Sequence, residues 1–175
     1  MKKKTTLVIG GCRSGKSSHA LGLADGLPGS KKIFIATSVP TDKEMENRVT
    51  RHRQERGELW TTVEEPLEIA DTIDRLSKSS GVILVDCLTL WTSNLMFNNL
   101  GQSAIELNLQ GLTSSLNRSH CPVILVSNEV GTGIVPENTL ARQFRDMAGF
   151  VNQQIAAVAH EVIWMVAGIP VKIKP

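Results

Sequence analysis

The sequence has few of the features that mark nucleic-acid-binding, membrane or secreted proteins. Its 175 residues contain no tyrosine and only 4% aromatic residues, and the formal net charge is +2. Little surface is left for stacking bases or following a phosphate backbone, which excludes a strongly basic nucleic-acid binder. No apolar run approaches the roughly 20 residues of a membrane helix, and the N-terminal lysines lead into a short strand-like run rather than a signal-peptide core. We therefore expect a soluble, cytoplasmic protein.

Cysteine is scarce and does not occur in pairs. Cys12, Cys87 and Cys121 form an odd set without a C-x-x-C motif and without a histidine at zinc spacing, so neither a disulfide framework nor a structural metal site is predicted. No internal repeat, low-complexity tract or long linker is present. The chain is 41% apolar and 21% charged, which suits a single domain with a real core, and we predict one domain over residues 1–175.

Short runs rich in valine and isoleucine alternate with segments of helical period. This pattern predicts an α/β fold with a mostly parallel sheet flanked by helices, because several runs are apolar on both faces. The predicted strands are Thr6–Gly10, Lys32–Ala36, Trp60–Glu64, Val82–Val85, Val123–Ser127 and Val162–Val166, with a final pairing segment at Val171–Lys174.

Two helices can be placed from their periodicity. One is predicted to start with Pro66 at its first position and to end before Gly81, with Ile69, Ile73 and Leu76 on one face. The other is predicted over residues 138–161, either as one long helix or as two abutting ones with the weak point at Gly149.

A phosphate-binding motif follows the first predicted strand. The spacing G-x-x-x-x-G-K-[ST] is met, and helix-compatible residues follow it. Its glycines let backbone N–H groups turn toward phosphate oxygens, where the helix start adds its positive end. Lys16 is placed to reach the β- and γ-phosphates, and the Ser17 hydroxyl to hold Mg²⁺. The motif comprises Gly10, Gly11, Cys12, Arg13, Ser14, Gly15, Lys16 and Ser17.

Asp86 is the second candidate for the magnesium site. It follows the apolar run Val82–Val85, at the carboxyl end of a predicted strand, where such a residue is expected in a protein with a phosphate loop. Together, the motif and the alternating pattern predict a P-loop NTPase fold of the RecA-like kind.

A polar helix carrying one histidine is predicted from Asp42 to about Arg56. A capping box opens it, and Gly57 stands where it would end. Composition alone favours a solvated basic helix. The same residues also suit catalysis, because an imidazole can attack phosphorus while flanking arginines neutralise phosphate oxygens. The candidates are the nucleophile His52 and its countercharges Arg48, Arg53 and Arg56.

Taken in order, these motifs resemble the bifunctional adenosylcobinamide kinase/adenosylcobinamide-phosphate guanylyltransferase family. The resemblance covers essentially the whole chain. The segments that carry it are the phosphate loop, Arg48–His52, Trp60–Pro66, Asp86–Asn94, the run S-N-E-V-G-T-G-I-V-P-E-N at Ser127–Asn138, Ala141–Asp146 and Ala167–Pro170.

The resemblance implies two transfers in the biosynthesis of adenosylcobalamin. The first moves the γ-phosphate of ATP or GTP to the aminopropanol hydroxyl of adenosylcobinamide. In the second, His52 attacks the α-phosphorus of GTP, expels pyrophosphate and carries GMP until adenosylcobinamide phosphate accepts it. Some relatives have a second histidine just before the nucleophile, but Arg51 stands there in this chain, so His52 is the carrier that the resemblance supports.

The resemblance also implies which residues bind the guanine nucleotide, and that the protein is a homo-oligomer, with a trimer favoured. A carboxylate suits guanine because it accepts hydrogen bonds from N1–H and the exocyclic amine together. Glu129 is open to two interpretations: it orients magnesium or the cobinamide hydroxyl, or it only fixes its loop. Besides the phosphate loop, the implied nucleotide contacts are Ala36, Thr37, Ser38, Arg53, Gln54, Glu55, Arg56, Glu64 and Asp86.

Two other classes of protein use the same loop. A plain P-loop small-molecule kinase would use the arginine helix as a lid, and His52 would have no covalent role. A GTP-dependent switch or a strand-binding module is disfavoured because no N-K-x-D guanine-reading run is present and both aromatic content and net charge are low.

Overall fold

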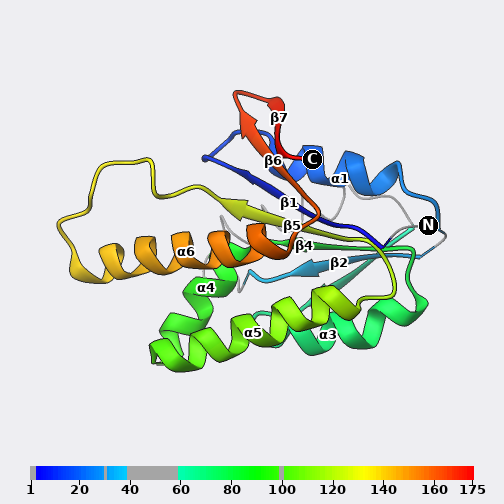
Figure 1. The fold of residues 1–175 in the computed structure, drawn as a ribbon, viewed down its shortest axis with the longest axis horizontal. Helices are drawn as coiled ribbons and strands as arrows, with labels where there is room; N and C mark the ends of the chain where they lie inside the picture. The colour runs from blue at the N-terminus through cyan, green and yellow to red at the C-terminus, as the bar shows by residue number, and fades with distance from the viewer. Residues whose placement is uncertain (1–2, 30, 39–58, 99–100) are drawn as a thin grey trace.

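The computed structural model describes residues 3–29, 31–38, 59–98 and 101–175, and these residues contain the expected alternation of strands and helices. Seven strands form one sheet in the order β3-β2-β4-β5-β1-β6-β7 (Figure 1). Six are parallel, and β7 runs antiparallel to β6, so the predicted mostly parallel sheet is confirmed. The strands are β1 Thr5–Gly10, β2 Lys32–Ala36, β3 Trp60–Glu64, β4 Val82–Asp86, β5 Val123–Asn128, β6 Glu161–Val166 and β7 Ile169–Lys174.

Helices cover both faces of the sheet. In Figure 1, α1 lies on one side, and α3, α4, α5 and α6 lie on the other. None of the described helices combines the length and the hydropathy needed to cross a membrane. The helices are α1 Lys16–Asp25, α3 Ile69–Leu76 with a 3₁₀ turn at Ser77–Ser79, α4 Leu88–Phe97, α5 Gln102–Arg118 and α6 Thr139–Val158.

Side chains of the central strands alternate between two apolar clusters. In β1, Leu7 and Ile9 pack into the cluster under α3 to α6, and Val8 packs into the cluster under α1. Successive strand residues point to opposite faces, so a strand covered on both sides needs apolar residues at every position. This is why the central strands appear in the sequence as continuous apolar runs.

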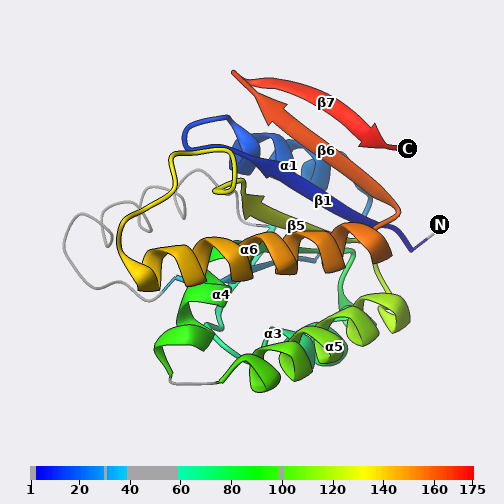
Figure 2. The same ribbon diagram turned by 60° about the vertical axis from the view of Figure 1, so that its left-hand side comes forward.

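The sheet ends in a tight hairpin. Ala167 and Gly168, at φ 50° and 83°, form the two-residue turn between β6 and β7, and a turn with two positive φ angles matches the twist of a hairpin. This turn makes β7 run antiparallel to β6, and β7 forms one edge of the described sheet while β3 forms the other (Figure 2).

The two helices predicted from periodicity differ from expectation at their ends. The start at Pro66 was wrong: one oxygen of Glu65 accepts hydrogen bonds from the N–H groups of Leu67 at 3.1 Å and Glu68 at 2.9 Å, so these residues form a turn and α3 begins at Ile69. Helix α6 is one helix that continues through Gly149 and is capped by Asn138, but it ends at Val158.

A buried carboxylate joins the N-terminal segment to the last hairpin. Glu161 pairs with Lys4 at 2.9 Å and with Lys172 on β7, and its side chain is 11% exposed. Burial by itself would raise the pKa of Glu161, but the hydrogen bonds and charges of the two lysines outweigh burial and hold this pKa below its ordinary value. The ionised carboxylate therefore stabilises the fold above the unfolded-state pKa of about 4.3, and this contribution is lost as the pH falls through the lower folded-state pKa.

We expect Glu161→Gln to lower the free energy of unfolding by about 1 kcal/mol at pH 7, because two lysines lose their countercharge. The difference from wild type should shrink as the pH falls below about 4. Urea unfolding at several pH values measures this. Glu106→Gln, which changes a carboxylate bound by Gln102 on the surface of α5, is the control and should change little. A Glu161→Gln deficit that stays constant down to pH 3 would contradict the assignment.

Candidate active site

The phosphate-binding motif forms a tight loop between β1 and α1, as predicted. Ser14 N–H donates to the Gly11 carbonyl at 3.3 Å, and Gly15 adopts φ 87° directly before the helix. Gly10 has no room for a side chain: an added Cβ would lie 2.6 Å from Ser14 Oγ and 2.7 Å from the Met165 carbonyl oxygen. Glycine is therefore required at both ends of the loop, at Gly10 by packing and at Gly15 by its backbone conformation.

Lys16 and Ser17 open the first turn of α1. In this structure Lys16 Nζ donates to the Gly11 carbonyl at 3.1 Å, so the ammonium group already folds back over the loop. Cys12 and Arg13 are exposed at its tip. A lysine placed over a loop of backbone N–H groups is the arrangement that binds the phosphates of a nucleotide.

The turn between β6 and β7 supports this loop from behind. Gly168 N–H donates to the Ser14 carbonyl at 3.1 Å, and the Gly168 Cα lies 3.5 Å from where a Cβ on Gly15 would be. Sequence reasoning did not find this contact, because it joins residues more than 150 positions apart.

Three further predicted residues lie level with one another at the carboxyl edge of the sheet. Ala36 ends β2 and is in register with Glu64 on β3 and with Asp86 on β4. Strand β5 separates β4 from β1, which places the phosphate loop two strands away from Asp86. The structure thus gathers Glu64, Ala36, Asp86 and the loop at one edge of the sheet.

Thr37 is fully buried, and its polar atoms are used inside the protein. Its hydroxyl accepts from Cys87 N–H and donates to the Cys87 carbonyl, both at 2.8 Å. Its N–H donates to the Asp86 carbonyl at 3.2 Å, and its carbonyl accepts from Asn94 Nδ2 at 2.7 Å. Thr37 therefore fixes the turn after Asp86, and direct contact with a nucleotide stays a prediction. Ser38 beside it is half-buried.

A buried polar network holds the end of β5. Ser127 Oγ donates to Asn152 Oδ1 at 2.6 Å and lies 3.3 Å from Thr89 Oγ1. Thr89 Oγ1 accepts from Asn128 N–H at 2.7 Å, and Asn152 Nδ2 donates to the Asn128 carbonyl at 3.2 Å. Residues of α4, β5 and α6 are thereby fixed against one another.

The loop that follows is held by its own side chains and by α6. Glu129 Oε1 accepts from Gly131 N–H at 2.7 Å, a contact that favours the loop-fixing interpretation of Glu129. Arg142 donates to the Pro136 carbonyl at 3.0 Å, and Arg145 donates to the Gly131 carbonyl.

The remaining predicted site residues lie outside the described residues. They are the proposed nucleophile His52 and the nucleotide contacts Arg53, Gln54, Glu55 and Arg56, together with Arg48, Arg51 and the predicted helix that carries them.

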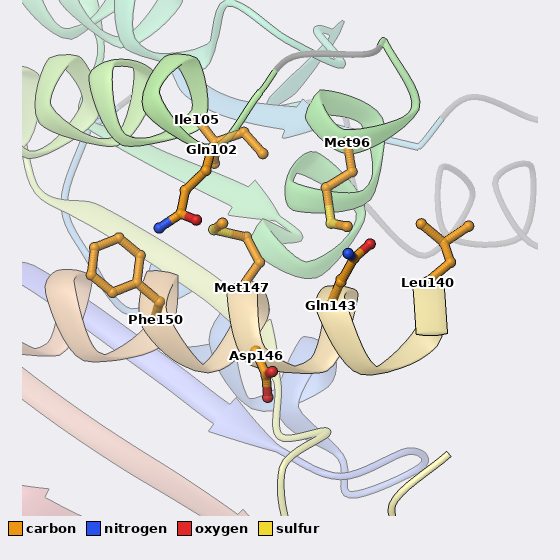
Figure 3. A pocket seen from close by; sticks show the side chains of 8 residues that line it. All are labelled: Met96, Gln102, Ile105, Leu140, Gln143, Asp146, Met147 and Phe150. Carbon is orange, nitrogen blue, oxygen red and sulfur yellow. The ribbon is translucent and has the colours of Figure 1, made fainter. Parts of the chain in front are cut away.

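A groove of about 560 Å³ lies between α4, α5 and α6 (Figure 3). Its described lining combines apolar side chains with two amides and one carboxylate. None of the predicted site residues that the structure describes lines it, so the assignment of the phosphate loop does not depend on this groove. The lining residues are Met96, Gln102, Ile105, Leu140, Gln143, Asp146, Met147 and Phe150.

The three cysteines are free and differ in exposure to solvent. Burial raises the pKa of the Cys87 thiol to about 11, and the adjacent Asp86 carboxylate adds to the shift. Burial also raises the pKa of Cys121. Because the thiolate is the nucleophilic form, Cys87 is not a suitable nucleophile at neutral pH even though it adjoins the site. Cys12, by contrast, is exposed on the phosphate loop.

We expect iodoacetamide at pH 8 to label Cys12 at least roughly tenfold faster than Cys121, because Cys12 is exposed and Cys121 is buried. Saturating GTP should slow the labelling of Cys12, since a bound triphosphate would cover the loop. Mass spectrometry of tryptic peptides measures both rates, with Cys121 as the internal control. Labelling of Cys12 at an unchanged rate in the presence of GTP would contradict the placement of the nucleotide.

The strand–loop–helix unit, with β5 between β1 and β4, defines a P-loop NTPase fold of the RecA-like kind. Solved structures with a similar fold include a KaiC-like protein of Pyrococcus horikoshii OT3 (TM-score 0.54, 15% identity) and the flagellar accessory protein FlaH of Methanocaldococcus jannaschii (0.54, 11%). The alignment with the KaiC-like protein covers 93% of this chain and 70% of that protein's chain. The alignment with FlaH covers 98% of this chain and 78% of the FlaH chain. A type III secretion ATPase aligns with 94% of this chain and 51% of its own at TM-score 0.61 and 9% identity.

The chain belongs to the cobinamide kinase / cobinamide phosphate guanyltransferase family, which it matches over residues 6–173. It is 44% identical to the bifunctional adenosylcobalamin biosynthesis protein CobU of Escherichia coli K12 and 42% identical to CobU of Salmonella typhimurium LT2; each alignment covers 96% of this chain and 98% of the relative. It is 41% identical to the protein CobP of Pseudomonas aeruginosa PAO1, with 96% of both chains covered. The family resemblance seen in the sequence is confirmed.

Proposed function

We propose that this chain phosphorylates adenosylcobinamide with ATP or GTP and then transfers GMP from GTP to adenosylcobinamide phosphate, giving adenosylcobinamide-GDP, with GMP carried on His52. As a family member it is a bifunctional kinase and guanylyltransferase of adenosylcobalamin biosynthesis. The observation that carries the assignment is the phosphate loop between β1 and α1, in a chain that matches the family over residues 6–173.

The kinase step depends on positioning and charge rather than on acid–base chemistry. Loop N–H groups and Lys16 bind the phosphates. Ser17 and Asp86 offer oxygen donors for Mg²⁺, which prefers such ligands and needs only one or two from the protein when phosphates and water supply the rest. Among the described residues, no group of three or more His, Cys, Asp or Glu side chains is placed to hold a metal ion. Mg²⁺ bound there would neutralise charge on the β- and γ-phosphates.

The guanylyl step needs a nucleophile that becomes a good leaving group on the return step. Imidazole meets both requirements at neutral pH, and its phosphoramidate is expected to be labile in acid and stable in base. A guanidinium stays protonated and is not nucleophilic, so Arg51 is no substitute. The raised pKa of Cys87 removes the thiol nearest to Asp86 from consideration.

We expect His52→Ala to abolish guanylyl transfer and to retain most of the phosphorylation of adenosylcobinamide. Lys16→Ala should lose both activities, with the kinase rate down by about 10²-fold or more, because the phosphates lose their nearest cation. The measurement is mapping of protein-bound label after incubation with GTP labelled at the α-phosphate and quenching in denaturant. His120→Ala, on a surface loop, is the control and should retain the label. Label that persists in His52→Ala, or that survives mild acid, would falsify this role for His52.

Assembly into a homo-oligomer, with a trimer favoured, is part of the proposal. An exposed apolar face on the β6–β7 hairpin supports it, because alternate residues of the two strands place these side chains on one face of the sheet. They are Trp164, Val166, Ile169, Val171 and Ile173, with exposed fractions of 41–65%. Figure 2 shows this hairpin at the edge of the sheet. The turn of this hairpin contacts the phosphate loop, so a subunit packed on the face would stiffen the support of that loop.

For the wild type, light scattering during size-exclusion chromatography should give the molar mass of an oligomer. The double variant Ile169→Ser and Ile173→Ser should shift it toward monomer, because the covered apolar area is lost. Leu107→Ser, an equally exposed position on α5, is the matched control and should leave the mass unchanged. A monomeric wild type that retains full guanylyl transfer would refute the assembly.

A further inference from the structure

Asn128 ends β5 between the two strands that carry the phosphate loop and Asp86. It is in register with Gly10 on β1, and the next residue, Glu129, donates its N–H to the Gly10 carbonyl at 3.0 Å. On the other side, Asp86 is in register with Val126, two residues before Asn128. Neighbouring strands lie about 4.8 Å apart, so Asn128 stands directly beside the first glycine of the loop.

The backbone of Asn128 is fixed by side chains of α4 and α6, which cover the same face of the sheet. Its N–H donates to Thr89 Oγ1 at 2.7 Å, and its carbonyl accepts from Asn152 Nδ2 at 3.2 Å. Thr89, Ser127 and Asn152 are at most 9% exposed. Burying three polar side chains is unfavourable unless they bond one another, as they do here, and their combined effect is to hold Asn128 in one place.

The side chain of Asn128, in contrast, has no hydrogen-bond partner among the residues that the structure describes. No hydrogen bond joins its amide to another described residue, and its Oδ1 is buried without one. A buried unpaired acceptor costs about 1–3 kcal/mol, so the fold does not by itself satisfy this amide. The carboxylate of Glu129 beside it is already bonded to Gly131 N–H. At the described end of β5, Asn128 is thus the polar side chain that makes no hydrogen bond to a described residue, and it lies next to the phosphate loop.

We propose that Asn128 is a catalytic residue of the kinase step, whose amide Nδ2 donates a hydrogen bond to an oxygen of the γ-phosphoryl group. The proposal rests on the proposed function. A phosphoryl group offers only acceptors to this neutral amide, so the contact has to come from the NH₂ donors and not from the buried acceptor Oδ1.

In this step the acceptor hydroxyl oxygen forms a bond to the γ-phosphorus. The bond from that phosphorus to the β–γ bridging oxygen breaks, and its electron pair stays on the departing nucleoside diphosphate. The hydroxyl proton passes to solvent. Asn128 is chemically unchanged: it orients the phosphoryl group in flight, and a fixed donor of this kind contributes about 10²–10³-fold to the rate. In guanylyl transfer the γ-phosphoryl group leaves within pyrophosphate, so the same contact matters less.

The test is Asn128→Asp, which keeps the shape and removes the donor, together with Asn128→Ser should the aspartate variant fail to fold. Asn108→Asp on α5, where Nδ2 donates to the Ala104 carbonyl at 2.9 Å, is the matched control. We expect Asn128→Asp to lower the kinase kcat by about 10²-fold and guanylylation of the protein by less than about tenfold, with an unchanged melting temperature.

Nucleotide binding tests Asn128 independently of the acceptor substrate. The probes are GTP and GDP with a methylene group between the α- and β-phosphorus, which cannot guanylylate the protein. Asn128→Asp should weaken binding of the GTP analogue by about tenfold or more and should change the affinity for the GDP analogue by less than about twofold. Equal weakening of both, or a kinase kcat within threefold of wild type, would overturn the proposal. A wild type without kinase activity would refute the proposed function and with it the catalytic role of Asn128, while the ratio of the two affinities would still decide whether Asn128 contacts the γ-phosphoryl group.

Discussion

The register that joins β1, β5 and β4 determines where the polar groups of the candidate site stand. Gly10 pairs with Asn128, and Val126 pairs with Asp86, so the phosphate loop, the end of β5 and the carboxylate share one edge. A slip by one residue would turn every side chain of a strand to the opposite face. Because the alternate residues of β1 pack into two separate apolar clusters, the core itself holds this register.

The phosphate loop depends on this strand register and on close packing behind the loop. Gly10 has no room for a side chain, because Ser14 and Met165 occupy the space where a Cβ would lie. The β6–β7 turn then bonds to Ser14. An anion-binding loop needs its N–H groups directed outward before the ligand arrives, and support of its carbonyls from behind achieves this without covering the donors.

Long-range polar contacts complete the edge of the sheet. Thr37 joins β2 to the turn after Asp86, and Asn152 of α6 joins Ser127 to Asn128. Each buried group in these contacts finds a partner from another element. Two buried groups at this edge have no partner among the described residues, Ser14 Oγ inside the phosphate loop and Oδ1 of Asn128, and of these Asn128 belongs to the neighbouring strand, beside the loop.

The sequence alone was sufficient for the strands, the parallel arrangement, the phosphate loop and the family, because these depend on local composition and on spacing within short segments. It misplaced the start of α3, where the carboxylate of Glu65 binds Leu67 and Glu68 and forms a turn that Pro66 also suits. Tertiary structure alone decided that Gly168 supports the loop, that Thr37 serves the fold, and that Asn128 is held between β1 and β4 with its amide unsatisfied. Those contacts join residues 24 to more than 150 positions apart, and no local pattern encodes which distant hydrogen-bonding groups a folded sheet will bring together.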